Sequence, residues 1–242
     1  MIPAFLSIFQ AYFHFESKYL VQLTLGTAMA CMVVNASCAT LAQNRKKSVC
    51  WQVPARHWPL LCIGTMAGVA LTAYAAAELI KACFGLYCIH SGYRMVTRKY
   101  LEPVFRPAGA NRLVVLLFSL LCGFTGTGGA NLFVPYLTRI VGLDLRTAMG
   151  TASAIQIPVA IVGAASFMAM GLLSQSPFIP GDGKAIGYIY LPAFLLVSVV
   201  GPYFSVAGVA VAHRLPATRL KLIFGAFTLF IGFKMVHSAV SV

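Results

Sequence analysis

Charged residues, and acidic residues above all, are scarce in this chain. Only five of its 242 residues are Asp or Glu, 18 are Lys or Arg, and charged residues make up 10% of the total. A soluble domain carries about 25% charged residues. Hydrophobic residues make up 60% of the chain. This composition excludes an ordinary soluble domain, and we expect no nucleic-acid partner.

Carboxylates are missing from the interior of every long apolar run. The five acidic residues all fall at expected helix ends or in loops: Glu16, Glu78, Glu102, Asp144 and Asp182. A proton relay through a membrane usually needs an ionisable group inside a spanning segment. The sequence therefore predicts no buried carboxylate relay.

The usual motifs of enzymes and metal sites are also missing. The cysteines form no CxxC pair, the histidines lack metal-ligand spacing, and no nucleophile stands in a pattern with a base. The start shows no signal-peptide pattern, so we expect no removable signal peptide. We expect no catalytic residue, no metal, no cofactor and no enzyme activity. The seven cysteines are interpreted as small packing residues: 31, 38, 50, 62, 83, 88 and 122.

Long uncharged runs fill most of the chain. Five of them reach the roughly 20 residues that a transmembrane helix needs: 19–44, 57–77, 113–138, 147–181 and 185–213. Two more, 82–93 and 222–233, are flanked by cations that can snorkel. The pattern predicts an all-α polytopic membrane protein in a lipid bilayer. Helices are expected at 4–15, 20–43, 58–77, 79–97, 113–141 (broken), 147–172, 186–212 and 219–240.

Two pairs of segments repeat within the chain. "KACFGLYCIHSGYRMV" at 81–96 matches "KLIFGAFTLFIGFKMV" at 221–236, an offset of 140 positions. "LGTAMA" at 25–30 matches "MGTASA" at 149–154, an offset of 124. The longer linker at 173–186 can absorb the difference. Internal repeats of this size indicate a duplicated transporter fold.

The distribution of cations predicts that the repeats are inverted. Loops 44–57, 94–112 and 213–221 are basic, whereas loop 173–186 has only Lys184. If 113–141 crossed the membrane once, 11 cations would lie inside and seven outside. If it enters and turns back, 14 lie inside and four outside, which agrees better with the positive-inside rule. We therefore expect 113–141 to be a re-entrant hairpin.

This topology divides the chain into two inverted repeats of three transmembrane helices, each with a Gly/Pro-broken re-entrant segment. The first repeat is expected at 1–100, a cytoplasmic linker at 101–112, and the second repeat at 113–242. The start "MIPAFL" is similar to "FVPYL" at 133–137, but no Gly-rich arm precedes it. We expect the first arm of the first hairpin to be missing.

"GFTGTGGANLFVP" at 123–135 is the strongest candidate site. Glycines and a proline crowd the middle of an uncharged run, and non-helical backbone survives in a membrane only where protein or water surrounds it. A helix that begins there would present free N–H groups and a positive dipole end to an anion. The candidate substrate-binding residues are Gly126, Thr127, Gly128, Gly129, Asn131 and Pro135. The alternative is that the glycines permit close helix packing.

Two further groups of polar residues are candidates for the same site. Gly26-Thr27 and Gly150-Thr151 occupy equivalent places in the two repeats. Their hydroxyls could donate to an anion or bond back to their own helices. Asn35 and Gln156 are the nearest uncharged amides on the same helices. They could donate to an anion or form helix–helix hydrogen bonds.

These segments resemble the TauE/SafE sulfite exporter family. The resemblance rests on "GFTGTGGANLFVPYL", "AMGTASA", "LGTAMA…NRKKSVCW" and "FGLYCIHSGYRM", and it extends from Ile2 to Val236. Members of the family have a Gly-x-Gly-Gly-Gly segment that leads to a proline, and here Ala130 replaces the last glycine.

The resemblance implies a permease of the bacterial inner membrane. Its substrates would be sulfite, small organosulfonates or related sulfur oxyanions. The competing interpretation is a membrane scaffold or accessory subunit that transports nothing. The direction of transport, the coupling ion and the oligomeric state stay open at this stage.

Overall fold

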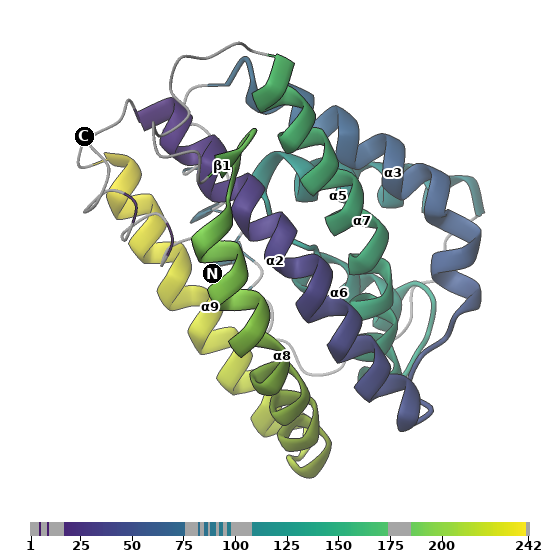
Figure 1. Cartoon of the computed structure of the whole chain (residues 1–242). Helices are drawn as coiled ribbons and strands as arrows, with labels where there is room; N and C mark the ends of the chain where they lie inside the picture. The colour runs from purple at the N-terminus through teal and green to yellow at the C-terminus, as the bar shows by residue number, and fades with distance from the viewer. Residues whose placement is uncertain are drawn as a thin grey trace.

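The computed structural model describes residues 17–75, 108–173 and 185–240, together with Phe5, Phe9 and scattered residues between Ala82 and Thr97. Almost all of these residues are helical (Figure 1). The helices are α2 (Ser17–Arg45), α3 (Gln52–Thr72), α5 (Ala108–Thr125), α6 (Ala130–Arg139), α7 (Leu145–Leu173), α8 (Leu191–Arg214) and α9 (Ala217–Val240). Strands β1 (Ala185–Ile186) and β2 (Ile189–Tyr190) form a small antiparallel hairpin.

Three of the described helices are long and apolar enough to cross a membrane. These spans are Tyr19–Arg45, Leu145–Leu173 and Leu191–Ala212. They overlap the expected helices at 20–43, 147–172 and 186–212. The coarse prediction of a predominantly helical membrane protein is therefore confirmed.

Helices α2 and α7 pack against each other in opposite directions and form the centre of the molecule (Figure 1). Gly26 near the start of α2 lies against Phe167 near the end of α7, while Gly150 near the start of α7 lies against Gln43. Between them, Gly163 lies against the side chain of Met29. Glycines at these crossings let the two backbones approach closely.

Helices α3 and α5 form a second tight pair, which runs in parallel. Gly64 of α3 lies against Ser119 of α5, and Gly68 one turn later lies against Phe124. The Ser119 hydroxyl is 3.2 Å from the carbonyl oxygen of Leu60 on α3. A small residue on each turn again permits the contact.

Helix α6 turns back along α5 after a break at residues 126–129. Phe118 of α5 meets Phe133 and Tyr136 of α6 edge to face, with ring centroids 5.9 and 6.3 Å apart. Both rings of α6 are buried. These contacts fix α5 and α6 as a hairpin, which leads through a short connection into α7.

Two predicted helix boundaries are wrong. The helix expected from 186 begins at Leu191, because residues 185–190 form the β1–β2 hairpin. Gly187 there has a φ of 56°, in the left-handed region that glycine adopts without strain. Helix α3, expected at 58–77, spans Gln52–Thr72 instead, and Pro54 sits in its first turn, where a missing N–H costs little.

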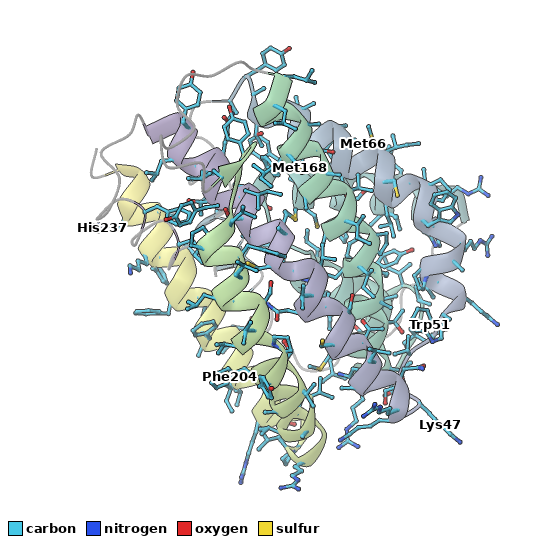
Figure 2. All side chains as sticks on the ribbon, viewed as in Figure 1. Lys47, Trp51, Met66, Met168, Phe204 and His237 are labelled. Carbon is cyan, nitrogen blue, oxygen red and sulfur yellow. The ribbon has the colours of Figure 1, made fainter. Side chains whose placement is uncertain are left out.

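Cationic residues gather at one end of the molecule. Helix α2 ends there at Arg45, α7 begins just before Arg146, α8 ends at Arg214, and α9 begins just before Arg219. In Figure 2, Lys47 lies at this lower end, whereas Met66 and Met168 lie toward the opposite end. Two of the basic loops that the sequence places on one side of a membrane, 44–57 and 213–221, are therefore at the same end of the structure.

Candidate functional site

The break between α5 and α6 is built by two glycines in left-handed backbone conformation. Gly126 has a φ of 65°, and Gly129, the N-cap of α6, has a φ of 77°. Residues with a Cβ atom rarely adopt these values. The break ends α5 at Thr125 and starts α6 at Ala130, which positions the first turn of α6 inside the protein.

The first turn of α6 carries backbone donors that have no acceptor among the described residues. The N–H groups of Leu132 and Phe133 both donate to the carbonyl oxygen of Gly129, over 2.9 and 2.8 Å. No described residue accepts a hydrogen bond from the N–H groups that precede them, those of residues 128–131. The positive end of the α6 dipole lies at the same place. Such a helix N-terminus favours an anion.

Gln156 of α7 lies directly against this break. A Cβ atom at Gly128 would overlap the side-chain amide of Gln156. The same amide nitrogen is 3.7 Å from the Met32 sulfur on α2, a weak acceptor. The structure thus brings two predicted site residues, Gly128 and Gln156, together between α2 and α7.

The Thr127 hydroxyl is held by its neighbours. Thr125 donates its proton to the carbonyl oxygen of Leu121 over 2.6 Å. The 2.8 Å contact between the Thr125 and Thr127 hydroxyls is therefore donated by Thr127. A hydroxyl has a single proton, so Thr127, which donates its proton to Thr125, has none left for a ligand. Its contact with Thr125 shapes the break.

Both Gly-Thr pairs of the prediction hold neighbouring backbone segments. The Thr27 hydroxyl accepts the N–H of Tyr190 over 3.0 Å, and the Thr151 hydroxyl accepts the N–H of Cys50 over 2.9 Å. Both threonines are fully buried. The Thr27 hydroxyl also donates to the carbonyl oxygen of Leu23. Both hydroxyl oxygens thus accept a backbone N–H, and the Thr27 proton, which the sequence suggested as an anion donor, is used within α2.

The glycines of these pairs have the same packing role. A Cβ atom at Gly26 would overlap the carbonyl oxygen of Tyr188, and a Cβ atom at Gly150 would overlap that of Ser48. Gly26 faces Phe167, which is 17 positions from Gly150 along α7. At 1.5 Å per residue the two pairs are about 25 Å apart. The structure does not bring them into one site.

Asn35 and Pro135 lie at the edges of the central region. The Asn35 side-chain oxygen is buried, faces Gly201 of α8, and accepts no hydrogen bond from a described residue. Pro135 is exposed on α6. The Asn131 backbone belongs to the first turn of α6, and its side chain lies outside what the structure describes.

A cavity of about 600 Å³ begins beside the first turn of α6. Ala130, Val134 and Pro135 of α6 line one side, and Phe204 and Gly208 of α8 line the other. Gln43 and Ser153 add polar atoms to a mostly apolar wall. Neither the cavity nor these two polar residues followed from the sequence, because nothing local in the sequence signals which helices leave a gap between them.

The described residues hold no group of three or more His, Cys, Asp or Glu side chains that could bind a metal ion. The described donors at the break are backbone N–H groups, the Gln156 amide, the Thr125 and Thr127 hydroxyls and the buried Cys122 thiol, which lies against Gly129. The backbone N–H groups and the amide suit recognition of an anion.

The family of the chain follows from comparison with known proteins. Residues 1–235 match the family model described as sulfite exporter TauE/SafE. The chain belongs to this family. The resemblance that its motifs predicted is therefore confirmed.

A relative of this TauE/SafE chain comes from Haemophilus influenzae (strain ATCC 51907 / DSM 11121 / KW20 / Rd). It is described as "Probable membrane transporter protein" and is 24% identical over 224 residues, which cover 89% of this chain and 81% of the relative. No solved structure matches the chain. Family membership and the apolar helices together identify a multi-pass membrane transporter.

Proposed function

We propose that this TauE/SafE protein is a permease of the cell membrane for small sulfur-containing anions such as sulfite or organosulfonates. The observation that carries the proposal is the first turn of α6, where the N–H groups of residues 128–131 have no described acceptor. An anion there would accept several charge-assisted hydrogen bonds, which are about twice as strong as neutral ones. The Gln156 amide, next to Gly128, could add a donor.

The proposed site lies between two inverted repeats. Equivalent residues of the two halves make reciprocal contacts: Thr27 with Tyr190 and Thr151 with Cys50. Thr27 and Thr151 are 124 positions apart, and their partners Cys50 and Tyr190 are 140 positions apart. These are the two offsets of the sequence repeats. Contacts exchanged in this way are typical of a two-fold axis. Because α2 and α7 run in opposite directions, an axis that exchanges them inverts the topology.

Glycine contacts of the last helix support the same relation. Gly85 lies against Gly232 of α9, and Gly92 lies against Gly225. The repeat equates Gly85 with Gly225 and Gly92 with Gly232, so these contacts are reciprocal as well. Met32 and Gln156 are also equivalent positions, and they touch each other. The axis therefore passes beside the α5–α6 break, where transporters with inverted repeats bind their substrates.

In this arrangement the α5–α6 hairpin would be re-entrant, with both ends on the cytoplasmic side. The basic helix ends at Arg45, Arg146 and Arg214 would then face the cytoplasm. Residues 173–186 would lie outside and residues 213–221 inside.

Thermal unfolding with and without anions, followed by transport, tests the proposal. A ligand at 100 times its dissociation constant stabilises a protein by about 2.7 kcal/mol. We expect sulfite or a small sulfonate to raise the unfolding temperature, while chloride at equal ionic strength does not. Proteoliposomes should then take up labelled sulfite. A protein that shows neither effect would be a scaffold or accessory subunit.

A further inference from the structure

The cavity on α8 has a filled counterpart in the other half of the molecule. Under the repeat relation proposed above, Gly208 of α8 corresponds to Gly68 of α3. A Cβ atom at Gly68 would overlap the carbonyl oxygen of Leu120 on α5, whereas a Cβ atom at Gly208 would meet nothing within 4 Å. Helix α5 thus covers α3, and no described residue covers the same place on α8.

Residues around these glycines follow the same pattern. Val69 and Thr72 of α3 are fully buried, while their counterparts Val209 and Ala212 line the cavity. On the central helices, Met29 is fully buried and its counterpart Ser153 lines the cavity. The cavity is therefore the place that α5 occupies in the other half.

The end of α5 fills the counterpart of the cavity in a specific way. Phe124 packs against the core cluster that contains Val69, and Gly126 in the break lies against the Leu25 side chain. Leu25 corresponds to Met149, which lines the cavity. A helix that filled the cavity in the same way would place its own glycine break next to Met149.

We propose that the α8 cavity is the docking site for a second apolar helix of the α5 type that lies outside residues 1–242. Such a helix carries a small residue on each contacting turn, as α5 does with Ser119 and Gly123, and ends in a glycine break. The described lining contains no charged residue, so the helix has an uncharged face there. The inference rests on the inverted-repeat relation of the proposed function.

Phe204 sets a further requirement for this helix. It corresponds to Gly64, whose place on α3 allows close contact with Ser119. Phe204 is 73% exposed and points away from the α8 axis (Figure 2). The docking helix must therefore have glycine or alanine opposite Phe204, where α5 has Ser119.

A disulfide test uses the sequence of α5 as a probe. The probe is a synthetic peptide of residues 108–129 with Ser119→Cys and Cys122→Ser. A Cβ atom at Gly64 would lie 3.0 Å from the Ser119 Cβ atom, near the 3.5–4.5 Å that a disulfide needs. The full-length protein therefore receives Phe204→Cys, which also removes the bulky ring. Tyr203→Cys is the matched control, because Tyr203 is 77% exposed and does not line the cavity.

We expect the peptide to form a disulfide with Phe204→Cys at least about tenfold faster than with Tyr203→Cys, as located by peptide mapping. Adding Gly208→Leu should abolish the difference, because its side chain would fill the groove that is now open. Equal rates at both positions, or rates that Gly208→Leu leaves unchanged, would overturn the proposal.

Other occupants give different results. If Phe204→Cys cross-links to itself in a concentration-dependent way that the peptide does not inhibit, the groove binds a second copy and the proposal is wrong. If a co-purified lipid occupies the groove, and the peptide does not react with Phe204→Cys even after this lipid is removed, the groove binds lipid and the proposal is wrong. Anion-dependent thermal shifts, measured on the same samples, report on the proposed function separately, since a protein can dock the peptide and bind no anion.

Discussion

Gly128, in the break between α5 and α6, lies against the side-chain amide of Gln156 on α7 so closely that no Cβ atom fits between them. This contact joins the glycine-rich segment to the central helix pair. It also complicates the simplest test of the site, because a side chain at 128 would both block an anion and displace Gln156.

A double substitution separates these two effects. Gly128→Ala alone should reduce transport per folded molecule by about ten- to a hundredfold, the loss of one charge-assisted contact worth about 1.5–3 kcal/mol. Gln156→Ala in the same chain makes room for the new Cβ atom, and Gln156→Ala alone measures how much transport depends on its amide. We expect the double variant to recover its thermal stability and to transport far less than Gln156→Ala alone. Recovery of both stability and transport would assign Gly128 to packing alone.

The two threonine contacts should behave as a pair. Thr27→Val and Thr151→Val each leave a backbone N–H, of Tyr190 or of Cys50, without its acceptor. An unsatisfied buried donor costs about 1–3 kcal/mol, so both variants should unfold at lower temperature by similar amounts, with anion affinity unchanged. Ser37→Ala is the control, because the Ser37 hydroxyl donates to Val33 of its own helix. A large loss of anion affinity at an unchanged unfolding temperature would indicate that these hydroxyls bind the anion.

Surface labelling tests the inverted topology. Ile186 and Pro216 are both exposed, and they lie in segments that we place outside and inside the cell. Ile186→Cys should react with a membrane-impermeant maleimide from the outside, and Pro216→Cys only after the membrane is opened. Reaction of both residues from the same side would contradict two inverted repeats.

Asp144 should link the stability of α7 to pH. It caps the helix by accepting the N–H of Thr147 over 3.2 Å, and hydrogen bonding from Thr147 lowers the pKa of this carboxyl below its ordinary value. A lowered pKa in the folded state adds stability that is complete above the ordinary pKa, near 4, and is lost as the pH falls below it. Asp144→Ala should cost about 1 kcal/mol at neutral pH.

Asp144→Asn is the matched control, since asparagine caps a helix without titrating. The unfolding temperatures of the natural protein and of Asp144→Ala should converge in acid. The difference in unfolding temperature between Asp144→Asn and Asp144→Ala should stay the same at every pH. If the unfolding temperatures of the natural protein and of Asp144→Ala differ by a constant amount down to pH 3, the charge of the carboxylate does not stabilise α7.

The sequence was informative wherever one local property determines the structure. The uncharged runs located α2, α7 and α8, because a membrane-length apolar run has few alternatives to a helix. The glycines at 126–129 located the break, since two of them adopt a backbone that other residues avoid. The repeated Gly-Thr pairs located two equivalent close contacts.

The rest depends on how distant segments meet. No local pattern indicates that Gln156 lies on Gly128, or that Thr27 accepts the N–H of Tyr190, 163 positions away. The β1–β2 hairpin was missed because its apolar residues continue the run that forms α8. The sequence predicted that the first arm of the first hairpin is missing, but it did not predict which helix would be left uncovered, because that depends on what packs on a helix rather than on the residues of the helix itself.

The two threonine contacts constrain the way in which this transporter can move. They hold α2 and α7 to the flanking backbone at two points about 25 Å apart. Sliding of one central helix along the other by a turn would break both contacts at once. The two helices therefore move as one rigid unit, without the shear motion in which packed helices slide past each other. We therefore expect any alternation between the two membrane faces to use hinge motion of the elements around α2 and α7.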